Sequence, residues 1–302
     1  MTRLGASPLR NASLCGALAA CVALFFGCAS APQPTAVDPL ALIDRDAALY
    51  LYIPAQSHLP LVTKALARIG GMDEKDAEKI AVRTQTIYIA EESTRARTLL
   101  QLAATGSFPA AMAKFALTPR NGWLPQTAAG LSLPYTYYKN TLSQVQVSLP
   151  SSANALVSYA VEPQLVLYDA ALAAPDAGGM PDGFDRAAYE FLTTGNPDDI
   201  RFYERKADAF FQDIVGVNLR LPLAAVSGVL EHSKKTDDHY YVTLMLDVAE
   251  ASATPAKMKA LLSSIKIALF GIPAKVTQTG ARRITIVDLE ISKETLLGTI
   301  AW

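Results

Sequence analysis

The apolar residues of this chain form one unbroken run near the start and only short periodic runs afterwards. Residues 12–26 are almost wholly apolar and uncharged, and Arg3 and Arg10 precede them with no acidic residue between. The run is shorter than the roughly 20 apolar residues that a transmembrane helix requires. A short positive segment before an apolar run of this length is typical of a secretory signal peptide. We therefore expect an exported protein with a signal over residues 1–27.

The segment that follows the signal has a different composition. Residues 29–39 (ASAPQPTAVDP) are mostly small or polar and include three prolines. Such a segment favours an extended, flexible linker over a packed element. We expect a stalk over residues 28–45 and a folded body from residue 46 onwards.

Periodicity in the first part of the body predicts strands mixed with helices. Apolar residues alternate or cluster in short runs typical of strands, and they recur at helical spacing in others. Gly, Pro and Asp separate these runs. The predicted strands are 48–53, 84–90, 98–104, 135–139, 142–149, 155–159 and a strand-like run at 164–167, and the predicted helices are 57–69, 73–79 and 106–117.

A loop rich in Pro, Gly and Asp over residues 174–183 (APDAGGMPDG) is the best internal boundary. It divides the body into a first α+β domain, 46–173, and a second, 184–302. Thr254 followed by Pro255 is a typical helix start, with a capping hydroxyl and then proline in the first turn. The second domain is predicted to contain strands at 200–203, 223–231, 240–248, 275–279 and 283–289, and helices at 207–215, 256–270 and 292–300.

The order of these elements predicts the fold class. Residues 49–117 and 200–270 both give strand, helix, strand, strand, helix, and a further strand follows each. This βαββαβ order is that of the ferredoxin-like arrangement. We therefore expect an α+β protein with two ferredoxin-like halves, each with an antiparallel sheet. Residue identity between the halves is low, so the duplication is structural and not a sequence repeat.

Two processing sites compete at the end of the signal. Phe25-Phe26-Gly27-Cys28 resembles a lipobox, in which lipid is attached to the cysteine thiol. Ala29-Ser30-Ala31 fits the A-x-A site of ordinary signal peptidase, but Pro32 directly after it disfavours that cut. Phe25 replaces the leucine that usually opens a lipobox. We expect Cys28 to be lipidated and to attach the protein to a membrane, with free secretion and an uncleaved anchor as alternatives.

Composition narrows the chemistry of the body. The chain has three cysteines, and all lie at or before Cys28, so the body has neither disulfides nor a thiol nucleophile. The whole chain has 27 Lys and Arg against 28 Asp and Glu, and the signal removes two of the arginines. No basic stripe with interleaved aromatic residues is present, so we expect no nucleic-acid partner.

Candidate catalytic residues are few. The motifs G-x-S-x-G, H-E-x-x-H and G-x-x-x-x-G-K-[ST] do not occur in the sequence. His58 is expected to be solvated at a helix start. His232 and His239 flank a polar hairpin tip, where two lysines would repel a cation. We predict no catalytic residue, no metal site and no cofactor, although a hydrolase without a recognisable motif stays open.

Aromatic residues offer the strongest candidate surface. Tyr50 and Tyr52, and likewise Tyr135 and Tyr137, are two residues apart and so share one face of a strand. Together with Trp123 they could bind a peptide, a glycan or an envelope protein. The competing interpretation is ordinary strand propensity and core packing.

The relaxed lipobox around Cys28 resembles those of spirochaetal lipoproteins, and the order of elements resembles exported tandem ferredoxin-like proteins of unknown function. The first resemblance implies a membrane-anchored lipoprotein with its body in the periplasm. Ala29 after the cysteine favours the outer membrane where aspartate marks inner-membrane retention, and this rule need not apply here. We expect a non-catalytic binding or scaffold role, with a small-ligand carrier that uses an inter-domain cleft as the alternative.

Overall fold

The computed structural model describes residues 36–70, 72–93, 98–109, 117–159, 164–174, 179–205, 207, 221–233 and 238–300. The signal, Cys28 and most of the predicted helices 106–117 and 207–215 lie outside the described residues. Residues from Ala36 onwards form one compact unit.

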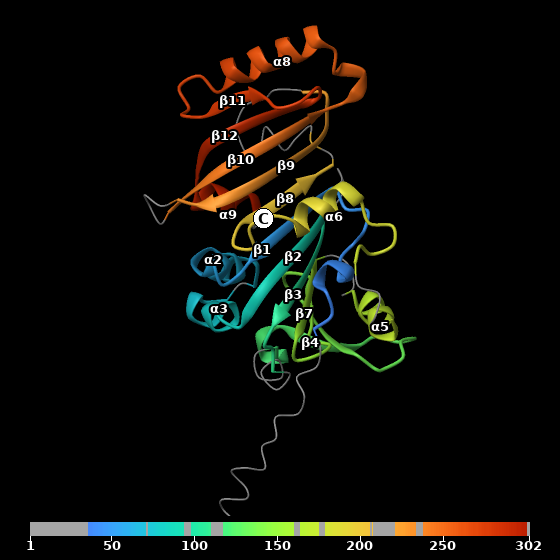
Figure 1. Ribbon diagram of the computed structural model, residues 1–302. Helices are drawn as coiled ribbons and strands as arrows, with labels where there is room; N and C mark the ends of the chain where they lie inside the picture. Colours follow the sequence, from blue (N-terminus) through green and yellow to red (C-terminus); the bar gives the residue numbers. More distant parts are fainter. Residues whose placement is uncertain are drawn as a thin grey trace, which may run out of the picture. The chain divides into compact units, whose positions relative to one another are not determined.

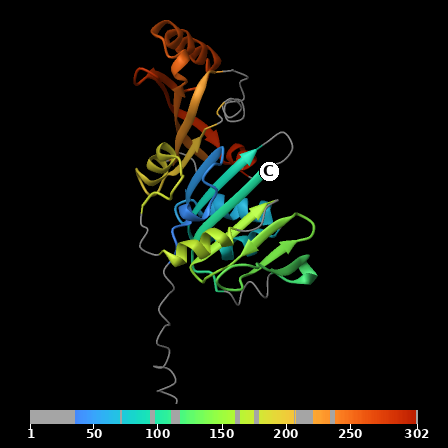
Figure 2. The same cartoon turned by 90° about the vertical axis from the view of Figure 1, so that its right-hand side faces the viewer.

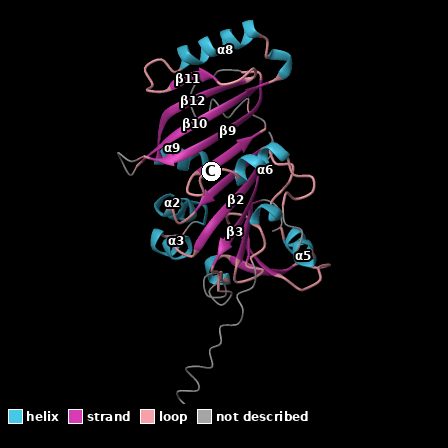
Figure 3. Ribbon diagram, viewed as in Figure 1, coloured by secondary structure: helices cyan, strands magenta, loops and turns pink. Residues whose placement is uncertain are grey.

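The described elements come in two successive groups (Figures 1 and 3). The first group consists of η1 (Pro39–Leu42), β1 (Leu49–Pro54), α2 (Leu59–Gly70), α3 (Glu74–Ala81), β2 (Thr84–Ser93), β3 (Thr98–Gly106), η2 (Pro119–Asn121), β4 (Trp123–Thr127), β5 (Thr136–Asn140), β6 (Val145–Ser148), β7 (Asn154–Tyr159), α5 (Leu165–Ala173) and α6 (Arg186–Thr193). The second consists of β8 (Ile200–Glu204), β9 (Leu223–His232), β10 (His239–Val248), η3 (Glu250–Ser252), α8 (Pro255–Ala268), β11 (Lys275–Gln278), β12 (Arg283–Ser292) and α9 (Lys293–Ile300).

All described strands belong to a single 12-stranded sheet, in the order β11-β12-β10-β9-β8-β1-β2-β3-β7-β6-β5-β4. Neighbouring strands are antiparallel throughout, including β1 and β8, which join the two groups. The α+β class with an antiparallel sheet is confirmed. The prediction of two separate ferredoxin-like sheets is not confirmed. Strand β1 of the first group is hydrogen-bonded to β8 of the second group, so both groups share one sheet. Element order does not determine which strands pair.

One face of the sheet, here called the aliphatic face, carries most of the core. The strict alternation of β10 places every second side chain there, and all of these are at most 1% exposed. Helices α2, α8 and α9 pack into the same cluster, and α8 lies alongside the edge strand β11 (Figure 1). The members from β10 are Tyr240, Val242, Leu244, Leu246 and Val248, and those from the helices include Leu61, Val62, Met258, Ile265, Leu296 and Leu297.

The opposite face of the first group, here called the tyrosine face, is also covered. Tyr50, Tyr52 and Tyr88 of β1 and β2 belong to a second core, to which residues of η1, α5 and α6 also contribute. Figure 2 shows α5, in yellow-green, beside the strands of the first group. In the second group the corresponding face of β10 stays half-buried. The first group is therefore a sheet between two layers, and the second a sheet with one covered face.

The packed body begins earlier than the expected boundary at residue 46. Leu40, Leu42 and Ile43 are fully buried against the tyrosine face. The side-chain amide of Asn154 donates to the carbonyl of Val37 at 2.8 Å and accepts from the amide of Val37 at 3.0 Å. A short apolar sequence within a proline-containing segment has no periodicity to mark it, so burial there could not be anticipated.

Two local predictions have clear outcomes. Thr254 caps α8, with its side chain accepting from the amide of Lys257, and Pro255 is the first helical residue, as expected. The strand-like run at 164–167 instead forms the start of helix α5. An unbroken apolar run does not distinguish a short buried strand from a buried helix, and this explains the error.

Candidate ligand-binding cavity

The predicted aromatic surface is mostly interior. Tyr50, Tyr52, Trp123 and Tyr135 are 0–7% exposed, and Tyr137 is only partly buried against the second core. Tyr50 and Tyr52 do share one sheet face, as the spacing predicted. That face is covered by η1, α5 and α6, so these rings form core and not an exposed binding surface. The correction favours the competing interpretation of ordinary core packing.

Tyr52 has a specific structural role at the junction of the two groups. Its hydroxyl donates to the carbonyl of Pro197 at 3.0 Å, and the Arg201 guanidinium lies 4.4 Å from its ring centroid. Arg201 is buried and also donates to the carbonyl of Thr194 at 2.7 Å. A cation over a desolvated aromatic face is stabilising. These contacts of Tyr52 and Arg201 hold the loop before β8 against β1.

His58 is buried, at 2% exposed, which corrects the expectation of a solvated side chain. Its Nε2 lies 2.8 Å from the carbonyl of Asp198, and its Nδ1 lies 3.2 Å from the Tyr240 hydroxyl. A carbonyl can only accept, so Nε2 carries the proton and Nδ1 accepts from Tyr240. Burial lowers the pKa of His58, which keeps the imidazole neutral.

The other histidines do not create a metal centre in the part of the chain that the structure describes. The His232 ring lies 5.3 Å from the Tyr240 ring, and its Nδ1 lies 3.1 Å from the Ser233 carbonyl. No cluster of His, Cys, Asp and Glu suited to a metal occurs among the described residues. Cys28 lies outside them, so its lipidation stays a prediction.

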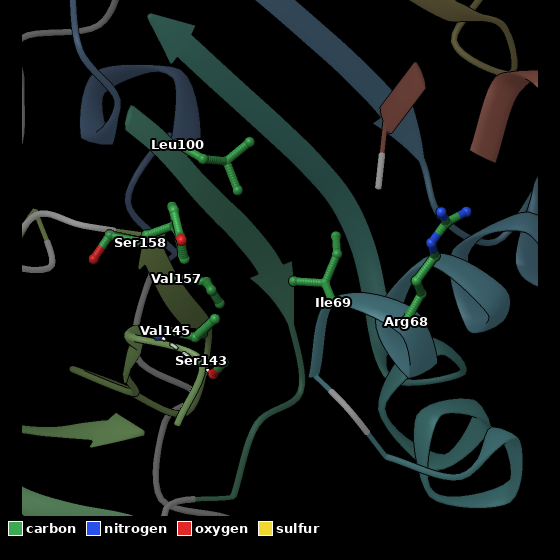
Figure 4. A pocket seen from close by; sticks show the side chains of 8 residues that line it. Arg68, Ile69, Leu100, Ser143, Val145, Val157 and Ser158 are labelled. Carbon is green, nitrogen blue, oxygen red and sulfur yellow. Dashed lines mark hydrogen bonds between the residues drawn. The ribbon is translucent and has the colours of Figure 1, made fainter. Parts of the chain in front are cut away.

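A hollow lies on the aliphatic face, among the residues that the structure describes (Figure 4). It has a volume of about 510 Å³ and lies between the C-terminal end of α2, strands β3 and β7, and the turn that joins β5 to β6. In Figure 4, Val145 and Val157 lie on one side and Ile69 on the other. The lining consists of Arg68, Ile69, Leu100, Ser143, Val145, Val157, Ser158 and Tyr159.

The hollow exists because α2 stops before it covers β7 and β6. Ile69 and Arg68 are in the last turn of α2, and beyond them the aliphatic face continues into Val157 and Val145. Val157 is only half-buried although it lies in the interior of the sheet. The space beside Val157 is therefore a hollow open to solvent and not a packed part of the core.

The chemistry of the lining is that of a binding site. Four aliphatic side chains and a tyrosine form most of the wall, and none of the described lining residues is a histidine, an acidic residue or a cysteine. Arg68 is exposed at the rim, with its guanidinium directed away from the strand residues in Figure 4. Ligand sites are generally apolar with a few polar groups that orient the ligand. This arrangement suits a largely apolar molecule.

Sequence reasoning missed this cavity entirely. Leu100, Val145 and Val157 read as ordinary strand residues, and Ile69 as the last apolar position of a helix. The residues come from four elements that are far apart in the chain. No local signal marks a sheet face that a helix fails to cover.

The described helices are all too short or too polar to span a bilayer.

The outer membrane protein TP0453 of Treponema pallidum (strain Nichols) is 24% identical over 217 residues, or 71% of each chain. Crystal form I of TP0453 matches with a TM-score of 0.63 and 25% identity, over 88% of this chain and 98% of that one. Form III matches over the same shares, with a TM-score of 0.63 and 23% identity. A family model described as outer membrane-associated lipoprotein TP0453 matches residues 34–297. The chain belongs to this family of outer membrane-associated lipoproteins.

Proposed function

We propose that the protein is a non-catalytic, lipid-anchored binding protein of the outer membrane that holds an apolar molecule in the cavity beside α2. The cavity is the observation that carries this proposal. Its volume of about 510 Å³ falls within the range of roughly 300–1,000 Å³ of small-molecule sites. The body is proposed to lie in the periplasm.

The expected affinity is moderate. Each buried methylene contributes about 0.8 kcal/mol, so a chain of about ten carbons would gain roughly 8 kcal/mol on full burial. Association costs offset much of this gain, and the opening to solvent leaves part of the ligand hydrated. Such a balance suits a ligand that is taken up and released.

The predicted lipid anchor would keep the cavity close to a source of such ligands. The chain is tied to the body at Val37 through Asn154, and only residues 29–36 separate this tie from Cys28. Fully extended, that segment spans at most about 28 Å. The tethered body would therefore stay within reach of one leaflet, where acyl chains are abundant.

An aromatic dye such as N-phenylnaphthylamine tests the proposal, using the mature chain with Cys28→Ala. We expect a blue-shifted, saturable fluorescence increase. Val157→Phe fills the cavity and should weaken binding about tenfold or more, which corresponds to about 1.4 kcal/mol. Val229→Phe is the matched control, since Val229 is also half-buried on a strand but does not line the cavity. Equal binding by both variants would refute the site.

A second function, direct contact with the bilayer, is favoured by the end of α8. Phe270 is 91% exposed and Ile267 is 75% exposed, next to Lys266. Apolar side chains beside a basic residue on a helix are typical of interfacial membrane binding. The predicted protein or peptide partner loses its main support, because the aromatic residues assigned to it are buried.

Co-sedimentation with phosphatidylglycerol vesicles tests this second function on the same Cys28→Ala chain. The double variant Ile267→Ser, Phe270→Ser should bind vesicles several-fold less. Leu142→Ser is the control, because Leu142 is 88% exposed but lies on the turn between β5 and β6, far from α8 in the sequence. Equal vesicle binding by the double variant and the control would exclude the α8 contact.

A further inference from the structure

A buried acidic residue lies one strand away from the cavity lining, opposite a residue of that lining. Glu91 is on β2, is 5% exposed and points to the aliphatic face. In the sheet register Glu91 is opposite Leu100, Leu100 is opposite Tyr159, and Tyr159 is opposite Val145. The last three residues all line the cavity. Opposed side chains on antiparallel strands have Cβ atoms about 4.5–5.5 Å apart, so Glu91 adjoins the wall.

The surroundings of Glu91 are apolar. Its neighbours on the same rung are Leu49 on β1 and Leu100 on β3. Among the described contacts its carboxyl has neither a hydrogen bond nor an ion pair. Two charged residues lie near Glu91 in the sheet or at the cavity. Glu204 is on β8, opposite the other side of Leu49, and Arg68 is at the cavity rim.

Burial without a partner changes the protonation of this group. Desolvation raises the pKa of Glu91 from 4.5 to about 7. A protonated carboxylic acid is a hydrogen-bond donor, whereas a carboxylate is an acceptor only. A carboxylate next to an apolar ligand would also be poorly solvated.

We propose that Glu91, as the neutral acid, completes the cavity and donates a hydrogen bond to the ester oxygen of an acyl ligand. Ionisation of Glu91 then opposes binding, and uptake of the ligand is coupled to uptake of a proton. This inference rests on the proposed function of the cavity and identifies its ligand class and its control. Glu91 acts as a specificity determinant: its hydroxyl distinguishes an ester from a plain hydrocarbon.

Two neutral probes separate the hydrogen bond from apolar burial. The methyl ester of dansylaminoundecanoic acid has a carbonyl acceptor, and diphenylhexatriene has none. Dissociation constants are measured for the mature Cys28→Ala chain from about pH 5.5 to about pH 8.5. Above about pH 7 the affinity for the ester should fall by up to tenfold per pH unit.

Two substitutions and one control test Glu91. Glu91→Gln keeps a donor at every pH, so its affinity for the ester should be independent of pH and close to the wild-type value at low pH. Glu91→Leu lacks the donor, so it should bind diphenylhexatriene without pH dependence and the ester several-fold more weakly than Glu91→Gln. Glu92→Gln alters the neighbouring half-buried acid and should keep the wild-type slope. Thermal melts at each pH identify any variant that fails to fold.

The outcomes separate the two proposals. If no variant binds either probe at any pH, the cavity is not a ligand site, and the proposed function fails together with this inference. If both probes bind but the wild type shows no slope, or Glu91→Gln keeps that slope, the role of Glu91 alone is wrong. If Glu91→Leu binds the ester as tightly as Glu91→Gln, the hydrogen bond is absent.

Discussion

The two groups of strands share one sheet but differ in what they bury. In β10 and β12 buried positions alternate with more exposed ones, so one face of these strands is left partly open to solvent. In the first group both faces are covered, and polar side chains such as Gln146 and Glu91 are buried with them. Three of the four described residues with buried, unpartnered side-chain atoms, Arg45, Gln146 and Gln164, belong to the first group, and Arg201 is at the junction.

This difference separates stability from function. A sheet with one covered face needs only apolar alternation, and its polar groups are satisfied by water. A sheet covered on both faces must satisfy every buried polar group internally, and places where it does not are costly. The cavity and the buried side chain of Glu91 lie in the first group. None of the described lining residues belongs to the second group.

The largest expected effect comes from the core of the second group. Leu246 is fully buried on the aliphatic face, so Leu246→Ala should lower the free energy of unfolding by about 2–5 kcal/mol. Urea unfolding followed by circular dichroism measures this. Under conditions where the variant is folded, its affinity for a cavity probe should match the wild type. A large loss of probe affinity would show that the two groups are not separable.

The dependence of stability on pH should also distinguish the two groups. The folded-state pKa of Glu91 is about 7, above its unfolded value of 4.5. The contribution of Glu91 to the stability of the protein is therefore complete below pH 4.5 and is lost as the pH rises from 4.5 to about 7. The size of the loss is roughly 3 kcal/mol. Glu91→Gln should abolish this decline in thermal melts. An unchanged pH profile would mean that Glu91 is solvated in the native state.

His58 should lower the stability of the protein at acid pH, whereas Glu91 lowers it as the pH rises. Its pKa is lowered in the folded state, so the unfolded chain takes up a proton first as the pH falls below about 6.5, and stability then decreases. His58→Gln should flatten this acid limb, while the Glu91-dependent change remains. The same melts, repeated with the double variant, test whether the two effects add. Retention of the acid limb in His58→Gln would assign it to another group.

A smaller effect is expected at the start of the body. Asn154→Ala removes both hydrogen bonds to Val37, and each such bond contributes about 0.5–1.5 kcal/mol. Because these bonds hold the first residues of the packed body, amide exchange and proteolysis should increase mainly near η1. Hydrogen exchange with mass spectrometry measures this. Increased exchange in β10 instead would mean that the contact supports the whole sheet.

The smallest effect is expected on the open face of the second group. Arg283 makes two hydrogen bonds, at 2.7 and 2.8 Å, to the carboxylate of Asp247 across neighbouring strands. The pair is partly exposed, so Arg283→Gln should cost at most about 1 kcal/mol, and less at high salt. Denaturant midpoints in low and high salt measure it. A cost similar to that of Leu246→Ala would show that this face is not solvated as described.

Much of the local structure was predictable. The sequence predicted a strand over residues 240–248, which forms β10, and Thr254 with Pro255 predicted the start of α8. The shared face of Tyr50 and Tyr52 also followed from spacing alone. These features depend on neighbouring residues, which a single sequence displays directly.

The candidate site was not predictable, and neither was the burial of His58. For the aromatic residues the sequence left two interpretations open, a binding surface and core packing. Alternation shows which side chains share a face, but whether that face is covered depends on remote segments. Leu40 and Leu42 in η1 cover the tyrosine face from a segment that reads as a linker. The pairing of β1 with β8, which joins the two groups, is equally remote in the chain.

By itself the sequence predicted export and a lipid anchor at Cys28, and it determined the α+β class and a body without cysteine. These follow from composition and from periodicity over a few residues. Only the tertiary structure decided that there is one sheet, that one half is covered on both faces, and that α2 ends short of Val157 and Val145. The physical reason is that a cavity is the space left between elements packed from distant parts of the chain, and no residue encodes it alone.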